Sequence, residues 1–476
     1  MAIVSQEKIL SVVASFNPWW QSGSVPKIFV KEFKRNGYYT CKQAFFNEIR
    51  RIVVMSGARR TGKTTIVYQI IDDLLNAGVK PQNILYLTFD HPVIRATDFD
   101  DLISMYRNNI SDNEEFYVFL DEVQYNKYWT NYLKILYDMN PKVRAVATGS
   151  ASSMVEGAVR ESGAGRWTVI KIPTLSFYEY CEIKGIKKEL PLINVFKMHE
   201  LSKQEQTRII MALSDLQIQL IKYLQIGGFP EFVNVEDIVY AQRILREDVV
   251  DRAIKHDLPS VYDIRSVDEL EKVFVYLCYH SSNIINVDAM SKEFEGVSKP
   301  TIEKYIGYLK SANLINVSKQ LNAEGKTVLK SKNKIYVADS GIRGSIVLGA
   351  DIVSKPEELG YALETSAYKH IKDYFFNQNT LYDVGYIRNS KGAEIDIAVQ
   401  YKGMPIQYVE AKMRKRSIIK DDDGIVIYGL KDVPGYVISK NATDYGLTEK
   451  ENTSLYRIPA FAFLYLIGKN DINVSI

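Results

Sequence analysis

The residues best suited to chemistry lie between Gly57 and Thr65, directly after an apolar, β-branched run. Glycines let backbone amides curl around phosphate oxygens, and a helix that starts there adds positive potential. Lys63 can reach the β and γ phosphates of a nucleoside triphosphate, and the Thr64 hydroxyl can ligate Mg²⁺. The pattern predicts a phosphate-binding loop for ATP, formed by Gly57, Ala58, Arg59, Arg60, Thr61, Gly62, Lys63, Thr64 and Thr65.

Two acidic residues, Asp121 and Glu122, follow the apolar run Phe116–Leu120. A buried strand would deliver both carboxylates to the carboxyl edge of a parallel sheet, where ligands of open α/β folds bind. There Asp121 would hold Mg²⁺ through water, and Glu122 would polarise the attacking water. Exposed acids often end strands, so the pair alone is a weak signal. After a phosphate loop it predicts ATP hydrolysis.

Two further polar residues lie next to predicted strands. Thr148 follows the strand Val143–Ala147, where its hydroxyl could sense the γ phosphate, although threonine is also an ordinary turn former. Arg166 precedes another apolar strand and could be an arginine finger or a nucleotide sensor. A surface arginine before a strand is the simpler interpretation. Both interpretations stay open for each residue.

The motifs together resemble the predicted AAA+ ATPases of archaea and bacteria that carry a C-terminal domain of formerly unknown function. An additional strand between the loop and the acids is typical of the catalytic-glutamate class of P-loop ATPases. The resemblance implies the same roles for the loop and acid residues, and it implies a helical lid over residues 191–260. The motifs that carry it are NPWW (17–20), GARRTGKTT (57–65), LDEVQ (120–124), TGSASSM (148–154), GAGR (163–166) and GGFPEFV (227–233).

A second group of polar residues lies near the C-terminus, in two alternating strands joined by YKGMP. If Gly403 centres a three-residue hairpin loop, residues 401 and 405 pair, and Asp396 lies opposite Glu410. Two opposed carboxylates repel each other unless a divalent cation or a proton intervenes. Oxygen ligands from two acids, with other positions open, suit Mg²⁺ or Mn²⁺.

This C-terminal group resembles the PD-(D/E)xK restriction-endonuclease-like fold. Ile395 stands where that pattern has proline. The resemblance implies a metal-dependent nuclease in which Lys412 positions or activates the attacking water. The alternative is an inactive nuclease fold that is kept as an interaction surface. The matching residues are Glu364 on a helix that begins near Leu359, followed by Asp396, Glu410 and Lys412.

The segment before this domain has the element order of a winged helix-turn-helix. The expected helices are Val267–Tyr279, Val287–Phe294 and Lys299–Ala312, and the expected wing strands are Leu314–Lys319 and Lys326–Val337. Lysines on a solvated face are common, but on a winged helix they favour contact with duplex DNA. The alternative is a domain-packing module. The lysines are Lys299, Lys304, Lys310, Lys319, Lys326, Lys330, Lys332 and Lys334.

The bulk composition is that of an ordinary globular protein. The chain has 476 residues, 46% of them hydrophobic and 25% charged, with a net charge of +3. Its three cysteines are far apart and fit a reducing cytoplasm without a zinc site. The sequence lacks a basic leader and any apolar run long enough to span a membrane, so we expect a cytoplasmic location. A homo-oligomer or a protein partner is compatible with these features.

Four regions are expected: a P-loop AAA+ core with an N-terminal extension (1–190), a helical lid (191–260), a winged helix (261–345) and a nuclease-like α/β domain (346–476). The first hypothesis is an ATP-hydrolysing enzyme that acts on DNA through a Mg²⁺-dependent nuclease. The second is a nucleotide-operated switch or scaffold with an inactive nuclease-like domain. A third is an ATP-dependent DNA transporter or remodeller that does not cut.

Overall fold

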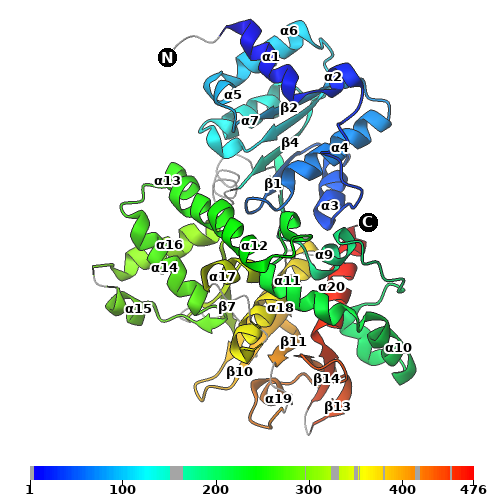
Figure 1. The fold of residues 1–476 in the computed structure, drawn as a ribbon, viewed down its shortest axis with the longest axis vertical. Coiled ribbons are helices and arrows are strands. Elements are labelled where there is room, and N and C mark those ends of the chain that lie inside the picture. Colours follow the sequence, from blue (N-terminus) through cyan, green and yellow to red (C-terminus); the bar gives the residue numbers. More distant parts are fainter. Residues whose placement is uncertain are drawn as a thin grey trace.

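A computed structural model describes residues 5–150, 165–294, 296–322, 332–347, 352, 354–378, 381–412, 419–450 and 453–475. Its N-terminal part, at the top of Figure 1, contains a parallel sheet covered by helices. This sheet has five strands in the order β2-β3-β4-β1-β5. β4 lies between the strand that precedes the loop and the strand that precedes the acids. The predicted α/β fold with a parallel sheet is confirmed. The strands are β1 (Ile52–Ser56), β2 (Ile84–Thr88), β3 (Tyr117–Asp121), β4 (Arg144–Gly149) and β5 (Trp167–Lys171).

Helices cover both faces of this sheet. Alternate residues of β1 point to opposite faces, so Ile52 and Val54 join one hydrophobic cluster while Val53 and Met55 join the other. The first cluster is closed by α1 (Gln6–Phe16), α5 (Pro92–Ala96), α6 (Phe99–Asn109) and α7 (Trp129–Met139). The second is closed by α2 (Trp19–Ser22), α3 (Asn36–Phe45) and α4 (Lys63–Asn76).

The middle of the chain is helical, as expected. Two π-helical segments, Arg246–Asp251 and Ala253–Asp257, continue the helix α12 toward α13. Such segments are rare and are frequently found at functional sites. The helices are α9 (Phe177–Ile183), α10 (Lys203–Leu213), α11 (Leu216–Ile226), α12 (Ile238–Leu245), α13 (Leu258–Val261), α14 (Val267–Tyr279), α15 (Val287–Glu293), α16 (Lys299–Ser311) and α17 (Ser340–Val347).

The three helices expected between residues 267 and 312 are confirmed as α14, α15 and α16, and Ser298 caps α16 by accepting a hydrogen bond from Thr301 N. The strands beside them are β6 (Asn283–Ile284), β7 (Ile315–Leu321) and β8 (Lys334–Val337). The expected start of the second wing strand, the turn before it and parts of the motifs TGSASSM and GAGR lie outside the described residues. A winged helix stays a prediction.

The C-terminal part extends the same sheet as β6–β8, because β7 pairs in parallel with β9. The nine strands follow the order β13-β14-β12-β11-β10-β9-β7-β8-β6. One hydrophobic cluster runs from Leu175 to Ile467 and joins the middle and C-terminal parts. The elements are α18 (Pro356–Gln378), β9 (Tyr382–Arg388), β10 (Glu394–Tyr401), β11 (Met404–Lys412), α19 (Gly424–Ile427), β12 (Gly435–Ser439), β13 (Gly446–Glu449), β14 (Ser454–Pro459) and α20 (Ala460–Ser475).

The hairpin β10–β11 corrects the expected turn but keeps the expected register. Tyr401 pairs with Met404, so the loop has two residues, Lys402 and Gly403, both with positive φ. A bulge between Val399 and Gln400 then restores the register, and Ile397 lies opposite Val409 as predicted.

No helix in the parts of the chain described above is long and apolar enough to cross a membrane.

Candidate functional site

The predicted phosphate loop connects β1 to α4. Gly62 has a φ of 86°, which turns the chain into the helix. A Cβ at Gly57 would come within 2.2 Å of the Ile172 carbonyl oxygen, so only glycine fits there. The loop therefore has the glycine-dependent geometry that exposes backbone amides to an anion at a helix N-terminus.

Lys63 is buried in this loop. Its Nζ donates hydrogen bonds of 2.9 Å to the carbonyl oxygens of Gly57 and Ala58, and burial lowers its pKa. Backbone carbonyls carry only partial charge, so a phosphate can replace them as the partner of the ammonium group. Thr64 Oγ1 donates to Asp121 Oδ2 at 2.9 Å, which places the predicted magnesium ligands together.

The acids at the end of β3 are held by hydroxyl groups. Asp121 accepts hydrogen bonds from Thr148 and, at 2.9 Å, from the hydroxyl of Tyr86. Glu122 lies in the left-handed region with a φ of 54°, and its backbone N–H donates to Thr148 Oγ1. Thr148 thus links the two acids, so its position agrees with a role at the nucleotide site.

The Glu122 side chain has an anchor that the sequence analysis did not assign. Gln124 donates to the Glu122 carboxylate and, at 2.9 Å, to Ser150 Oγ. Burial raises the pKa of Glu122, while Lys63 lowers it. A carboxylate with a raised pKa, fixed at a sheet edge beside a buried lysine, is suited to orient and polarise a water molecule. The only sequence signal for Gln124 was its place in the motif LDEVQ, two residues after Glu122.

The two arginines of the loop bind acids of the helical region. Arg59 makes a two-point contact with Asp257, with Nε–Oδ2 at 2.5 Å and Nη2–Oδ1 at 2.8 Å. Arg60 contacts Glu231 and, at 2.6 Å, Asp248. Asp248 and Asp257 both belong to the π-helical segments, so the helical region is connected to the loop through charge.

Arg166 does not join this site. It precedes β5, and its carbonyl accepts a hydrogen bond from Ile52 N, at the amino edge of the sheet. The loop and the acids lie at the carboxyl edge. Arg166 instead pairs with Asp138, with Nε–Oδ1 at 2.9 Å. The expected role as a nucleotide sensor within the same chain therefore does not agree with its position, because strand β5 separates it from the loop.

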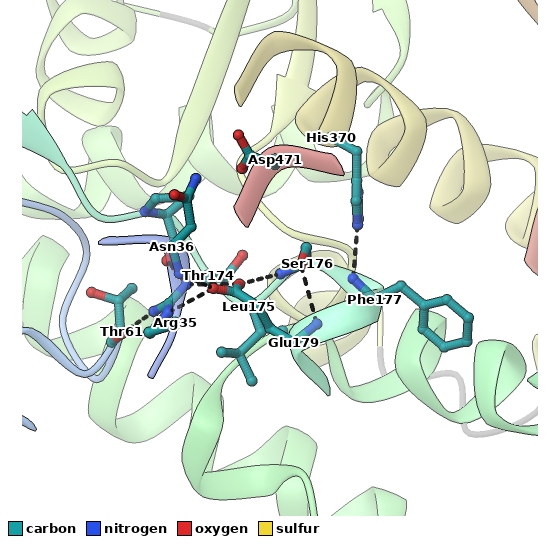
Figure 2. Close-up of polar contacts among 12 residues, drawn as sticks. Arg35, Asn36, Thr61, Thr174, Leu175, Ser176, Phe177, Glu179, His370 and Asp471 are labelled. Atoms are coloured by element: carbon teal, nitrogen blue, oxygen red, sulfur yellow. Dashed lines mark hydrogen bonds and ion pairs between the residues drawn. The ribbon is translucent and has the colours of Figure 1, made fainter. Parts of the chain in front are cut away.

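A buried arginine joins the loop to the rest of the molecule (Figure 2). Arg35 donates to the Thr61 carbonyl oxygen and, at 3.0 Å, to the Pro173 carbonyl oxygen, and its ion pair with Glu179 spans 3.2 Å. Glu179 also accepts from Ser176 N and closes a capping box at the start of α9. Sequence reasoning missed this residue, since its partners are far away in the chain.

The helix α18 meets the same junction. Figure 2 shows His370 pointing at the start of α9, where Phe177 N donates to its Nε2 at 2.8 Å. Burial and the neighbouring Lys369 lower the pKa of His370 to about 3. Lys369 forms a buried ion pair of 3.0 Å with Asp339. Because α18 also contains Glu364, one helix connects the junction with the predicted nuclease-like residues.

The C-terminal carboxylates converge, as the register predicted. Asp396 Oδ2 accepts from Ala411 N at 3.1 Å, and Lys412 Nζ lies 2.7 Å from Glu410 Oε1. Glu364 accepts a hydrogen bond of 2.9 Å from the Tyr336 hydroxyl. Burial and the charge of Asp396 raise the pKa of Glu364 to about 7 and that of Glu410 to about 8.

A lysine that the sequence analysis assigned to a DNA-facing surface lies inside this cluster. Lys334 Nζ is 2.8 Å from Glu364 and 2.7 Å from Glu394, and only 2% of its side chain is exposed. Its assignment to the surface was wrong, because β8 pairs into the extended sheet and turns this residue inward. Lys326 and Lys330 lie outside the described residues.

The cluster does not fit a divalent ion as the sequence predicted. Within the parts of the chain that the structure describes, no group of three or more acidic, histidine or cysteine side chains is arranged to hold a metal. An ammonium group already lies among the carboxylates. Metal ligation by Asp396 and Glu410 therefore stays a prediction that this arrangement does not favour.

Comparison with known proteins agrees with the N-terminal geometry. Residues 49–181 match the family model of an AAA domain, and residues 217–351 match a domain of unknown function (DUF8612). An uncharacterized protein of Haemophilus influenzae is 26% identical over 327 residues, 66% of this chain and 74% of that protein. An uncharacterized protein of Methanocaldococcus jannaschii is 24% identical over 429 residues, 86% of this chain and 88% of that protein.

Among solved structures, a Walker-type ATPase of Pyrococcus abyssi aligns with 65% of this chain and 94% of its own, at 15% identity and a TM-score of 0.37. The match to the AAA domain covers β1, the loop, both acids and β5. Residues 49–181 are thus similar to AAA domains, and the parallel sheet with its phosphate loop agrees with a P-loop NTPase fold.

Proposed function

We propose that the chain binds ATP with Mg²⁺, hydrolyses it, and works as a nucleotide-operated switch. The observation that carries the proposal is the pairing of Lys63 with two replaceable carbonyl groups beside the linked pair Thr64 and Asp121. In this arrangement Lys63 and the loop amides bind the phosphates. Thr64 and Asp121 hold Mg²⁺, and Glu122 orients the water.

The switch rests on the arginines of the loop. A bound triphosphate places several negative charges beside Arg59, whose present partner Asp257 contributes one. The phosphates therefore compete with the π-helical segments for the guanidinium group. Binding would loosen residues 246–257, and hydrolysis followed by phosphate release would restore the contact.

ATP hydrolysis by purified protein tests the first part. Lys63→Ala is expected to abolish nucleotide binding and hydrolysis together. Glu122→Gln is expected to keep binding and to slow hydrolysis by about 10²-fold or more, the usual effect of losing a general base. Hydrolysis that is unaffected by both substitutions would show that the activity belongs elsewhere.

Hydrogen exchange tests the second part. In Glu122→Gln, ATP is expected to speed amide exchange in residues 246–257. Asp257→Asn serves as the matched control, because it removes the contact with Arg59 and should exchange quickly without nucleotide. Tight ATP binding without any change in exchange would contradict the switch and leave the ATPase assignment intact.

A second candidate function is metal-dependent cleavage of DNA. The bond from Ala411 N to Asp396 supports it, because it holds Asp396 beside the pair formed by Glu410 and Lys412. Lysines on α16 would contact the DNA backbone if the winged-helix prediction holds. The test is plasmid nicking with Mg²⁺ or Mn²⁺, with Lys412→Ala as the control. Nicking that survives this substitution would place the activity outside the cluster.

A further inference from the structure

Lys334 reaches the carboxylate cluster from an element that the nuclease-like pattern does not include. It begins β8, on the far side of β9 and β7 from β10 in the shared sheet. Its Nζ lies 2.8 Å from Glu364, 2.7 Å from Glu394 and 3.5 Å from Asp396. One ammonium group therefore contacts carboxylates from a helix and from two positions of a strand.

The charges of the cluster favour a cation at this position. Four carboxylates gather here, from Glu364, Glu394, Asp396 and Glu410, and three of them contact Lys334. Carboxylates that share one partly buried site repel each other strongly unless a positive charge or a proton lies between them. Without the ammonium group, a divalent ion would meet this need with oxygen atoms of the same carboxylates.

We propose that Lys334 is the resident cation of this cluster: its ammonium group holds Glu364, Glu394 and Asp396 together in the place of a divalent ion. The cluster then binds metal only when Lys334 is removed. Lys334 is thus a positioning residue that determines the cation specificity of the site. This inference does not depend on the proposed ATPase activity, and it opposes the second candidate function, which needs metal in the wild-type cluster.

One carboxylate oxygen of the cluster has no hydrogen-bond partner. Glu410 is 4% exposed, and its Oε1 pairs with Lys412 while its Oε2 has no hydrogen-bond partner. A metal ion between Asp396 and Glu410 would satisfy that oxygen. Lys334 contacts Oδ1 of Asp396 and does not pair with Glu410, so the unsatisfied oxygen of Glu410 is the further ligand that a metal would recruit after the lysine is lost.

Binding of Mn²⁺ to the full-length chain without nucleotide tests the proposal, with free Mn²⁺ followed by electron paramagnetic resonance. Lys334→Met is expected to bind one more Mn²⁺ per chain than the wild type. Adding Asp396→Asn to this variant should remove that ion. Lys319→Met is the matched control, because it makes the same change at an exposed position of the neighbouring strand β7, and it should bind Mn²⁺ as the wild type does.

A double variant shows whether Mn²⁺ binds because the ammonium group is gone or because the cluster has become more negative. It also guards the test against misfolding of the single variant. Lys334→Met with Glu364→Gln removes one positive and one negative charge, so the net charge of the cluster is unchanged and the protein should fold. It is still expected to gain an Mn²⁺. If neither variant gains an ion, the proposal is wrong. It is equally wrong if the wild type binds an Mn²⁺ that Asp396→Asn removes.

Discussion

Lys63 and Lys334 are both buried, but their partners differ. Lys63 donates to two backbone carbonyl groups in the phosphate loop, while Lys334 lies among three carboxylates. An incoming phosphate can replace neutral partners, because charge-assisted hydrogen bonds are about twice as strong as neutral ones. It cannot draw Lys334 away from several full negative charges. A buried lysine is ready for an anionic ligand when its present partners are neutral.

The same comparison holds for the acids. The carboxylates of Asp121 and Glu122 accept hydrogen bonds from neutral hydroxyl and amide groups, which leave their charge available to a metal ion or a water. In the C-terminal cluster the charge of the acids is used inside the protein. Similar residue types are thus arranged for binding in one region and for internal neutralisation in the other.

The largest expected effect is on stability. Lys334→Met should lower the free energy of unfolding by about 3–5 kcal/mol, because it leaves buried carboxylates without their counter-ion. Lys63→Met should change it by no more than about 1 kcal/mol, because the lost partners are neutral carbonyl groups. Urea unfolding followed by far-ultraviolet circular dichroism measures both.

Tryptophan fluorescence shows in which part of the molecule each of the two variants, Lys334→Met and Lys63→Met, loses stability. All four tryptophans, Trp19, Trp20, Trp129 and Trp167, lie in the N-terminal part. Lys334→Met should therefore shift the dichroism transition more than the fluorescence transition. Equal losses of stability in the two variants would remove the distinction between the two lysines.

The sequence predicted the N-terminal region well because its signals are local. The order of strand, glycine loop and helix fixes the position of Lys63, and the acids follow their strand directly. Helix α14 lies where it was expected, around Val267 to Tyr279, and Ser266 caps its start. In the C-terminal hairpin, the register was right even though the turn was not, because the bulge after Val399 compensated for the shorter loop.

The residues that the sequence did not reveal have partners far away in the chain. Lys334 was grouped with surface lysines, although it begins an otherwise apolar strand and its partners are 30 to 62 residues distant. Arg35 contacts Glu179 across 144 residues. The partner of such a residue cannot be read from the sequence around it, because only the tertiary fold brings the two together. A charge inside a buried strand is the one sequence signal that could have identified Lys334.

A second prediction concerns the junction between the two regions, where His370 must be neutral to accept the hydrogen bond from Phe177 N. Its pKa is about 3 in the fold and about 6.5 in the unfolded chain. Between these values the unfolded chain binds more protons, so stability falls as the pH drops below about 6.5. The loss from this group should reach roughly 2.5 kcal/mol by pH 4.5.

His370→Gln isolates this contribution. The amide oxygen can accept from Phe177 N and the amide nitrogen can donate to the Ser366 carbonyl oxygen, as the imidazole does, but the side chain does not titrate. The variant should lose less stability than the wild type between pH 7 and pH 4.5. Lys369 and Asp339, which face the imidazole, are unchanged in both proteins. Parallel pH profiles would mean that His370 does not limit the acid stability of the junction.

The smallest expected effect is at Arg166, which contrasts with Arg59 within the N-terminal region. Arg166 lies at the amino edge of the sheet and pairs with Asp138 in solvent, whereas Arg59 lies in the loop and is bound to the π-helical segment. Arg166→Ala should leave ATP affinity and hydrolysis within about twofold of the wild type, since a screened surface pair contributes little. Arg59→Ala should alter both. Fluorescent-nucleotide titration and steady-state phosphate release measure the two quantities. If Arg166→Ala abolished hydrolysis but kept ATP affinity, Arg166 would act on the nucleotide site of a second copy of the chain. The contrast between Arg166 and Arg59 within one chain would then not predict their roles.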